Sequence, residues 1–203
     1  MTAPKGSDSV RDPESTRIKK TIIDAASRLF EKKGLYETSV AEIAETAGIS
    51  VPVTYHYVSR KSDIMLLIME DFTDQFEGQA LAVLAALTDP KEKLARAMEI
   101  FFRIVDEQLV KVVLVYRKSR TLDKPGRDRV KAAEIRHVRI FEEILREGME
   151  KGAFRPMDPD LVAYNVLMAG HTWALKKWHF QGKFNLNEFL KHQTEFIMAA
   201  VSA

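Results

Sequence analysis

Apolar residues recur at every third or fourth position along nearly the whole chain, which is the spacing that lines one face of an α-helix. Residues that favour helix N-termini, such as Asp before Pro or Ser three positions before Glu, precede most of these segments. The pattern therefore predicts an all-α fold of about nine helices. The expected helices cover residues 13–34, 39–48, 50–58, 61 to beyond 76, 89 to beyond 105, 108–122, a segment ending at 152, 158–179 and 185–201.

Residues 110–116 are the one stretch with the valine-rich character of a strand. The stretch lies between helical segments and has no turn residues beside it. We therefore predict that it is helical, and that Lys124-Pro125-Gly126 breaks the helix that contains it.

The composition narrows the classes of protein that the chain can be. It has 203 residues, of which 46% are hydrophobic and 30% are charged, and its net charge of +2 excludes a uniformly basic coat. Cysteine is absent, which excludes disulfides, thiolate metal sites and cysteine nucleophiles. The longest apolar runs, 64–69 and 80–87, fall far short of the roughly 20 residues that span a bilayer. The first residues lack the apolar core of a secretory signal, so we expect a cytoplasmic protein.

Changes in composition and in helix pattern along the sequence predict that the chain has three parts. Residues 1–11 are polar and rich in Ser, Gly and Pro, and we expect a disordered arm. Residues 12–61 contain the first three helices and are expected to form a helix-turn-helix domain, and residues 62–203 contain the remaining helices. The stretch from Ser39 to Lys61 consists of two short helices joined by a turn at Gly48, which is the pattern of a helix-turn-helix.

The second of these short helices favours contact with DNA. Within seven residues it carries Tyr55, His56 and Tyr57, three aromatic rings with polar ends. Thr38 and Ser39, at the start of the preceding helix, could offer hydroxyls and backbone N–H groups to a phosphate.

Residues 16–72 resemble the DNA-binding region of TetR-family transcriptional regulators. The matching residues are Ile22-Ile23-Asp24-Ala25-Ala26, Leu29-Phe30, Gly34, Thr38-Ser39-Val40, Ile43-Ala44, Ala47-Gly48-Ile49-Ser50 and Tyr55 through Ile64. The resemblance implies a homodimeric repressor that binds double-stranded operator DNA and a small-molecule effector. Contacts to bases are implied at Val51, Pro52, Val53, Tyr55, His56 and Tyr57, and a phosphate contact at Lys61.

The rest of the chain then corresponds to a helical effector-binding and dimerisation domain. Residues 147–154 and 170–180 resemble members that regulate fatty-acid or sterol catabolism, which often sense acyl-CoA thioesters. A drug-like effector controlling efflux genes is the alternative. The large apolar groups expected to line the pocket, together with two polar ones, are Phe72, Phe76, Met98, Phe101, Phe102, Tyr116, Phe141, Leu145, Met168 and His171.

Residues 103–155 contain 14 Lys and Arg against 9 Asp and Glu, a net charge of +5. This excess could meet the phosphates of coenzyme A. The candidate contacts are Arg117, Arg120, Arg136 and Arg139.

Two apolar stripes follow the segment 158–179. A helix that is apolar on more than one side needs cover on both sides, and a second copy of the chain could supply it. One stripe contains Leu161, Met168, Leu175 and Trp178. The other stripe is expected to form the dimer interface together with residues of the last helix, giving Val162, Val166, Gly170, Trp173, Phe189, Phe196 and Ile197.

Two other functions are disfavoured. The sequence has no GxSxG, GxGxxG, P-loop or HExxH motif, so we do not expect an enzyme. The five histidines do not combine with carboxylates at metal-ligand spacing, so neither a metal nor a cofactor is expected. A helical adaptor that binds only protein is the remaining alternative, and it would show no salt-dependent affinity for DNA.

Overall fold

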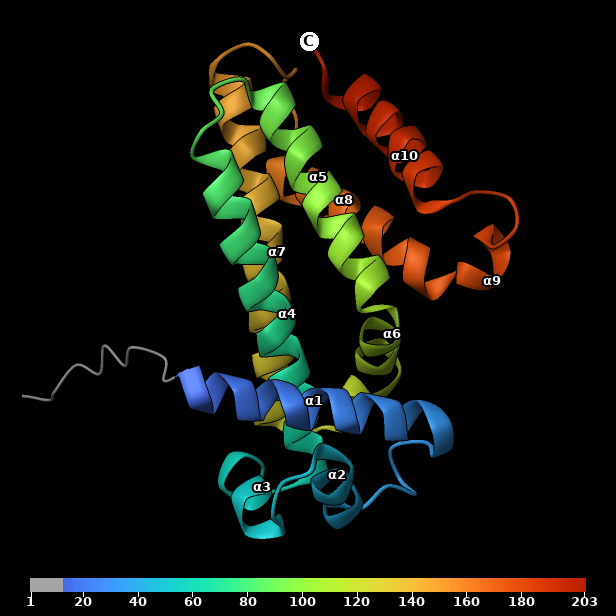
Figure 1. The fold of residues 1–203 in the computed structure, drawn as a ribbon. Coiled ribbons are helices and arrows are strands. Elements are labelled where there is room, and N and C mark those ends of the chain that lie inside the picture. The colour runs from blue at the N-terminus through green and yellow to red at the C-terminus, as the bar shows by residue number, and fades with distance from the viewer. Residues whose placement is uncertain (1–12) are drawn as a thin grey trace, which may run out of the picture. The chain divides into compact units, whose positions relative to one another are not determined.

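The computed structural model describes residues 13–203, apart from the side chain of Lys61. The predicted arm at 1–11 and the helix signal at Asp12 lie outside the described residues. Within them the chain forms ten α-helices, one short 3-10 helix and no strand (Figure 1). The all-α prediction is therefore confirmed, with one helix more than expected. The helices are α1 (Pro13–Lys33), α2 (Val40–Ala47), α3 (Val51–Tyr57), α4 (Lys61–Leu84), α5 (Pro90–Glu107), α6 (Leu109–Lys118), η1 (Ser119–Thr121), α7 (Lys124–Glu150), α8 (Pro159–Leu175), α9 (Lys177–Phe180) and α10 (Leu186–Val201).

Contacts divide the chain into two compact units between Leu67 and Ile68, inside α4. The first unit holds α1, α2, α3 and the first turns of α4. Its core is built from apolar residues on the inner faces of these helices, which are Ile22, Ile23, Ala25, Ala26, Ile43, Ala44, Val58, Ile64 and Met65. Gly48 has φ 67°, and this left-handed conformation lets the chain turn sharply from α2 into α3.

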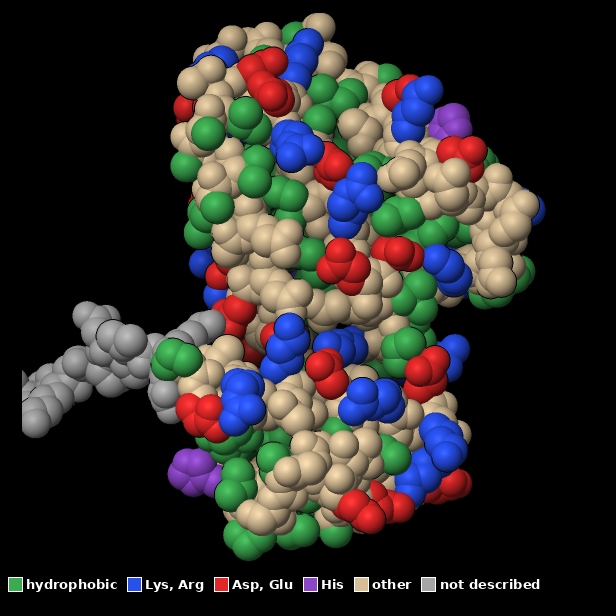
Figure 2. Space-filling view, in the orientation of Figure 1, with side chains coloured by type: hydrophobic (Ala, Val, Ile, Leu, Met, Phe, Trp, Pro, Cys, Tyr) green, Lys and Arg blue, Asp and Glu red, His purple; other side chains and the backbone are tan. Residues whose placement is uncertain are grey.

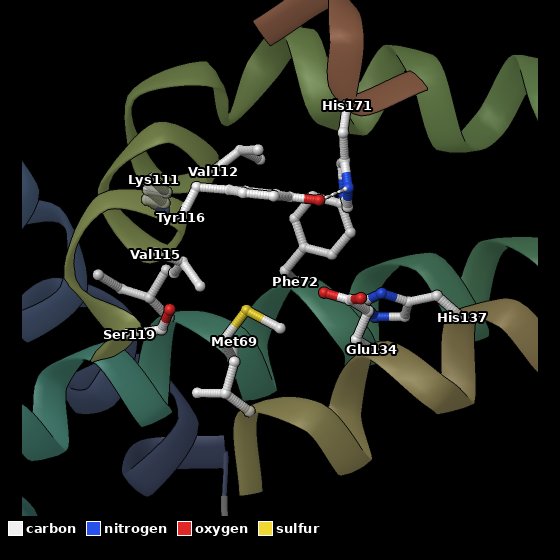
Figure 3. Close-up of a pocket in the computed structure, with 12 residues that line it drawn as sticks. Met69, Phe72, Lys111, Val112, Val115, Tyr116, Ser119, Glu134, His137 and His171 are labelled. Carbon is white, nitrogen blue, oxygen red and sulfur yellow. Dashed lines mark hydrogen bonds between the residues drawn. The ribbon is translucent and has the colours of Figure 1, made fainter. Parts of the chain in front are cut away.

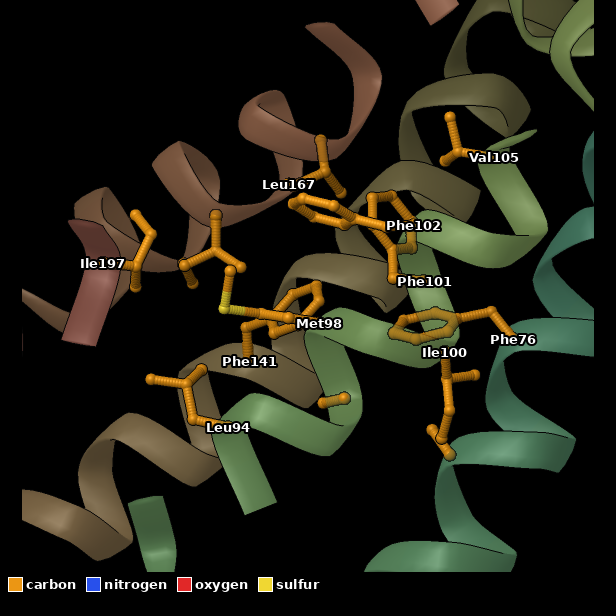
Figure 4. Packing of buried hydrophobic residues seen from close by; sticks show 14 of the residues in the cluster. Phe76, Leu94, Met98, Ile100, Phe101, Phe102, Val105, Phe141, Leu167 and Ile197 are labelled. Carbon is orange, nitrogen blue, oxygen red and sulfur yellow. The ribbon is translucent and has the colours of Figure 1, made fainter. Parts of the chain in front are cut away.

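The second unit, Ile68–Ala203, is arranged around α5, which packs against α7, α8 and α10. Figure 4 shows its centre, where Met98, Phe101 and Phe102 of α5 meet Phe76 of α4 and Phe141 of α7. All five side chains are fully buried. Their rings pack mostly edge to face, for example Phe76 on Phe101 with centroids 5.0 Å apart. This cluster is the main hydrophobic core of the unit.

Residues 110–116 are helical, as predicted, because they lie within α6. The break expected at Lys124-Pro125-Gly126 is wrong. Asp123 caps α7 by accepting a hydrogen bond from Gly126 N at 3.0 Å, and Pro125 lies in the first turn, where a helix tolerates proline. The interruption falls instead at η1 and the two residues after it.

The single helix expected over 158–179 is also wrong, because α8 ends at Leu175. Lys176 leaves the helical region with φ −120° and ψ 25°. Lys177 then lies 3.1 Å from Asp106 Oδ1 and 4.0 Å from the centroid of the Trp173 ring. These contacts hold the chain where it turns into the short α9. No helix among residues 13–203 is long and apolar enough to cross a membrane.

Candidate functional site

Helix α3 presents one side to solvent and fixes the other by local hydrogen bonds. Ser50 caps the helix by accepting from Val53 N at 3.4 Å. Thr54 is fully buried and donates to Ser50 O at 3.2 Å. The exposed side carries Val51, Val53 and Tyr55, whose exposed fractions are 38%, 39% and 51%. Figure 2 shows hydrophobic side chains and a histidine at the surface over this helix.

Most of the residues expected to contact DNA lie on this exposed side. Pro52 and His56 are exposed as well, while Tyr57 is half-buried with its ring 5.3 Å from that of His56. The side chain of Lys61 is outside the described part of the chain. These positions together form a surface of apolar and aromatic groups, and their contacts with DNA remain predictions.

The start of α2 differs from the expectation. Thr38 is 1% exposed and donates its hydroxyl to Gly34 O at 2.9 Å, so it is not available to a phosphate. Ser39 is exposed, but its hydroxyl and amide form a capping box with Glu42. Hydrogen bonds from Lys33 and then from Ser39 lower the pKa of Glu42 to about 2. These two residues therefore serve mainly to fix the start of the helix.

The turn after α3 is fixed by Asp63. Its Oδ2 accepts from the backbone amides of Ser59 and Arg60, at 3.0 Å and 2.9 Å. Arg60 Nε also lies 3.6 Å from Asp63 Oδ1. The carboxylate thereby starts α4 and sets where α3 ends.

The second unit contains a cavity of about 100 Å³ between α4, α6, α7 and α8 (Figure 3). Apolar groups form most of its wall, and a few polar groups lie among them. The lining residues are Ile68, Met69, Phe72, Lys111, Val112, Val115, Tyr116, Ser119, Val130, Glu134, His137 and His171.

Three hydrogen-bond contacts join the cavity wall to α8. The hydroxyl of Tyr116 lies 2.7 Å from Nδ1 of His171 and 3.3 Å from Sδ of Met168. The hydroxyl of Tyr164 donates to Oε1 of Glu134 at 2.7 Å. Burial, followed by the charge of Glu134, raises the pKa of Tyr116. The hydrogen bond to Glu134 is the main cause that raises the pKa of Tyr164 to about 12.

Both histidines of the cavity are neutral at neutral pH. Burial lowers the pKa of His171 to about 4. Burial, with smaller contributions from His171 and Arg136, lowers the pKa of His137 to about 3. Nε2 of His137 lies 2.8 Å from Oγ1 of Thr73. The cavity therefore offers neutral hydrogen-bonding groups in an apolar wall.

Three of the residues expected in the pocket, Phe72, Tyr116 and His171, line this cavity. Met168 does not line the cavity. Its Sδ accepts from the hydroxyl of Tyr116, and its side chain is 38% exposed on α8. The prediction that the other six line the pocket is wrong, because each is fully buried among the side chains of the core rather than along the cavity. They are Phe76, Met98, Phe101, Phe102, Phe141 and Leu145.

Sequence reasoning missed most of α6. Val112, Val115, Tyr116 and Ser119 have the spacing of one helical face, a pattern that is visible in the sequence. The lining residues of α7, Val130, Glu134 and His137, also share one helical face, but two of the three are polar and so do not extend an apolar stripe. The arginines expected to bind phosphate are all exposed. Arg136 pairs with Glu77, whereas Arg117 and Arg120 flank the lining residues Tyr116 and Ser119 in sequence.

The prediction of which side of α8 forms the dimer interface is also wrong. Val166, Gly170 and Trp173 face the core of their own unit, and Val162 is partly buried against it. A Cβ on Gly170 would lie 2.7 Å from the Phe101 ring, so this glycine lets α8 approach α5 closely. On α10, Phe189 and Ile197 are buried, while Phe196 is 69% exposed. The outward-facing residues of α8 are those of the other side, namely Leu161, Tyr164 and Met168.

Two family models match the chain. Residues 22–68 match the model described as bacterial regulatory proteins of the tetR family, and residues 87–201 match the tetracyclin repressor-like C-terminal domain. The chain belongs to the TetR family. The predictions of the family, of a DNA-binding transcriptional regulator and of a helical ligand-responsive domain are thereby confirmed.

This TetR-family chain has similar relatives among characterised regulators. It is 33% identical over 183 residues to the transcriptional regulator HbdR of Aromatoleum sp. (strain CIB), covering 90% of this chain and 80% of the relative. It is 30% identical over 177 residues to the transcriptional repressor KstR2 of Mycolicibacterium smegmatis, covering 86% and 84%. The fold is also that of AibR, solved with isovaleryl coenzyme A and operator DNA, with a TM-score of 0.71, 24% identity and coverage of 88% and 97%.

Proposed function

We propose that this protein is a homodimeric repressor that leaves a palindromic operator when a small, largely apolar effector enters the cavity of the second unit. The observation that carries the proposal is the cavity itself, an apolar space with a few neutral polar groups, in the domain that follows a helix-turn-helix. The protein acts by binding rather than by catalysis. It works in the cytoplasm, where a bacterial operator lies.

The volume of the cavity limits the size of the effector group that it can hold. An engineered apolar cavity of about 150 Å³ holds one benzene molecule. A cavity of about 100 Å³ that opens to the surface suits a short acyl chain, or a single ring that reaches into the opening, and it is too small for a sterol nucleus. A short-chain acyl-CoA fits this description if its coenzyme A moiety stays outside. Arg117 and Arg120, exposed next to the lining residues, could then meet its phosphates.

The related fold of AibR, in complex with isovaleryl coenzyme A and operator DNA, supports this class of effector. A drug-like hydrophobic compound, with efflux genes as targets, is the second candidate. The apolar wall of the cavity favours it as much as an acyl chain, but the exposed arginines do not.

The exposed side of α3 is proposed to read the operator. Val51 and Val53 could contact thymine methyl groups, while Tyr55 and His56 supply polar groups for bases or phosphates. Such a surface relies on apolar contacts with base edges as much as on hydrogen bonds.

The dimer is proposed to form through the exposed apolar side of α8, which carries Leu161, Tyr164 and Met168, together with Phe196 of α10. Tyr164 and Met168 also bond to Glu134 and Tyr116 of the cavity wall. An effector that bonds to those wall residues would compete with or strengthen these contacts. It can then favour one arrangement of the dimer, as a differential affinity for two states requires.

The test measures release of DNA labelled with a fluorophore, using an operator captured from the genome. Isovaleryl-CoA or another short-chain acyl-CoA should lower the affinity for DNA at least about tenfold, whereas free coenzyme A should not. Ser119→Phe, which narrows the cavity, should keep DNA binding and lose the response. Thr121→Phe, an exposed position in the same short helix, is the matched control and should respond like the wild type. Release by drug-like compounds alone would favour the second candidate, and no release by either class would contradict the proposal.

A further inference from the structure

The hydrogen bonds around His137 favour one of its two neutral tautomers. The hydroxyl of Thr73 donates its single hydrogen to Met69 O at 2.7 Å. With its hydrogen on Met69 O, the same oxygen accepts from Nε2 of His137, 2.8 Å away. In this arrangement Nε2 carries the hydrogen and Nδ1 keeps a lone pair. Because burial keeps this imidazole neutral, as its lowered pKa shows, Nδ1 is an acceptor.

That acceptor has no partner among the described residues. His137 is 1% exposed, and Nδ1 is buried without a hydrogen bond. The nearby rings are those of Phe72 and Phe76, with centroids 5.2 Å and 5.7 Å from the imidazole, and they offer no donor. A buried acceptor without a partner is unfavourable, so the site favours a ligand that brings a donor.

His137 is also part of the cavity wall. It lines the cavity with Glu134, one turn earlier on α7, and Figure 3 shows the nitrogen-bearing edge of its ring turned toward the other lining residues. Two other polar groups of the wall already have partners. Tyr116 bonds to His171, and Glu134 accepts from Tyr164. The unpaired acceptor therefore belongs to the space that an effector would occupy.

We propose that the effector group held in this cavity is a small apolar chain or ring bearing a hydroxyl, which donates its hydrogen to Nδ1 of His137. The inference rests on the proposed function, since it takes the cavity as the effector site. Thr73 is a positioning residue, because it holds the tautomer that makes Nδ1 an acceptor. A site built around a buried acceptor discriminates strongly against an analogue that lacks the donor.

The experiment compares phenol with fluorobenzene, which has the same number of heavy atoms but no O–H. Binding to the full-length protein is measured by titration calorimetry at neutral pH. Phenol should bind at least about tenfold more tightly to the wild type. His137→Phe, which keeps a ring but removes the acceptor, should abolish this preference. His192→Phe changes an exposed histidine of α10 and should retain it.

A second variant and a spectrum keep the test independent of that substitution. Thr73→Val keeps the shape of the side chain but releases the tautomer, so it should reduce the preference for phenol. The ¹⁵N spectrum of the imidazoles should show His137 as the Nε2–H tautomer. Phenol should shift its Nδ1 resonance, and fluorobenzene should leave it in place.

Three results would overturn the inference: equal binding of the two probes, binding of neither, or a preference for phenol that survives His137→Phe. The last result would place the donor on another acceptor, such as Glu134. Failure of the proposed function looks different, because DNA release is measured separately. If phenol is preferred through His137 but no cavity ligand affects DNA binding, only the effector role is wrong. If acyl-CoA releases DNA without any preference for the hydroxyl, only the present inference is wrong.

Discussion

Single residues decide how closely the helices of the second unit can pack. Gly148, near the end of α7, has no room for a side chain, because a Cβ there would lie 2.9 Å from Cγ of Phe154 and closer still to other atoms of that ring. Phe154 is 2% exposed and its backbone pairs with Ser202 after α10. Gly78 of α4, in contrast, has open space around it, with nothing within 4 Å of the position that a Cβ would occupy.

These two glycines give a matched pair of substitutions. Gly148→Ala should destabilise the protein by about 1–3 kcal/mol, because the ring of Phe154 must move within a packed core. Gly78→Ala should stabilise it by about 0.5–1 kcal/mol, because alanine loses less backbone freedom in a helix. Urea unfolding at one protein concentration measures both. Equal effects of the two substitutions would contradict the close packing of α7 against Phe154.

The buried histidines make stability depend on pH in a defined direction. His137 and His171 have pKa values of about 3 and about 4 in the folded protein, below the ordinary value of 6.5. Below pH 6.5 the unfolded chain binds protons that the folded protein does not, so stability is full above that pH and is lost as the pH falls toward 4.

At pH 5.5 each of the two histidines should lower the free energy of unfolding by about 1.4 kcal/mol relative to its value at high pH. Urea unfolding at pH 7.5 and pH 5.5 measures the loss. His137→Phe should remove about half of the loss of unfolding free energy that these two histidines cause. If the variant and the wild type lose stability equally, His137 is not buried in its neutral form.

At the scale of elements, helix starts could be read from the sequence because they depend on neighbouring residues. The capping residues Ser39, Ser50, Asp89, Asp158 and Asn185 each accept a backbone hydrogen bond at the start of a helix, where the sequence pattern predicts them. Which side of α8 is buried could not be predicted from neighbouring residues. Both of its sides are apolar, and its packing against other helices, α7 and, at Gly170, α5 among them, decides which side is buried.

The exposed side of α8 leads to a prediction about assembly. Leu161→Glu places a charge on the proposed interface and should convert the dimer to monomers without unfolding them, because Leu161 is 62% exposed in the single chain. Leu81→Glu, at an exposed leucine of α4 with a similar exposed fraction of 64%, should leave the dimer intact. Analytical ultracentrifugation distinguishes the outcomes. A dimer that survives Leu161→Glu but not Leu81→Glu would place the interface on α4.

At the scale of the whole molecule, the two functional regions differ in how far the sequence could predict them. The helix-turn-helix lies within about two dozen consecutive residues, so its capping residues, turn and exposed aromatic groups form a local pattern. The cavity draws residues from four helices between Ile68 and His171. Which large apolar residues line it, rather than fill the core, depends on packing between distant segments, and six of the expected residues proved to be core.

The division into two units agrees with a separation of tasks. The first unit exposes α3, and the second contains the cavity. Neither task requires a strong overall charge, which agrees with a net charge of +2. Binding to DNA would still weaken steeply with added salt, since contacts to phosphates release counterions.

The most direct test of the account is the capture of genomic fragments of the source organism on the purified protein, followed by sequencing. The protein should enrich one short palindrome, with half-sites about 10 base pairs apart or a multiple of that distance. A variant with Tyr55→Ala and His56→Ala should remain dimeric and lose this enrichment. If no palindrome is enriched at low or moderate salt, even after bound ligand has been stripped, or if the variant enriches the same sequence equally well, then α3 does not read an operator and the central claim is wrong.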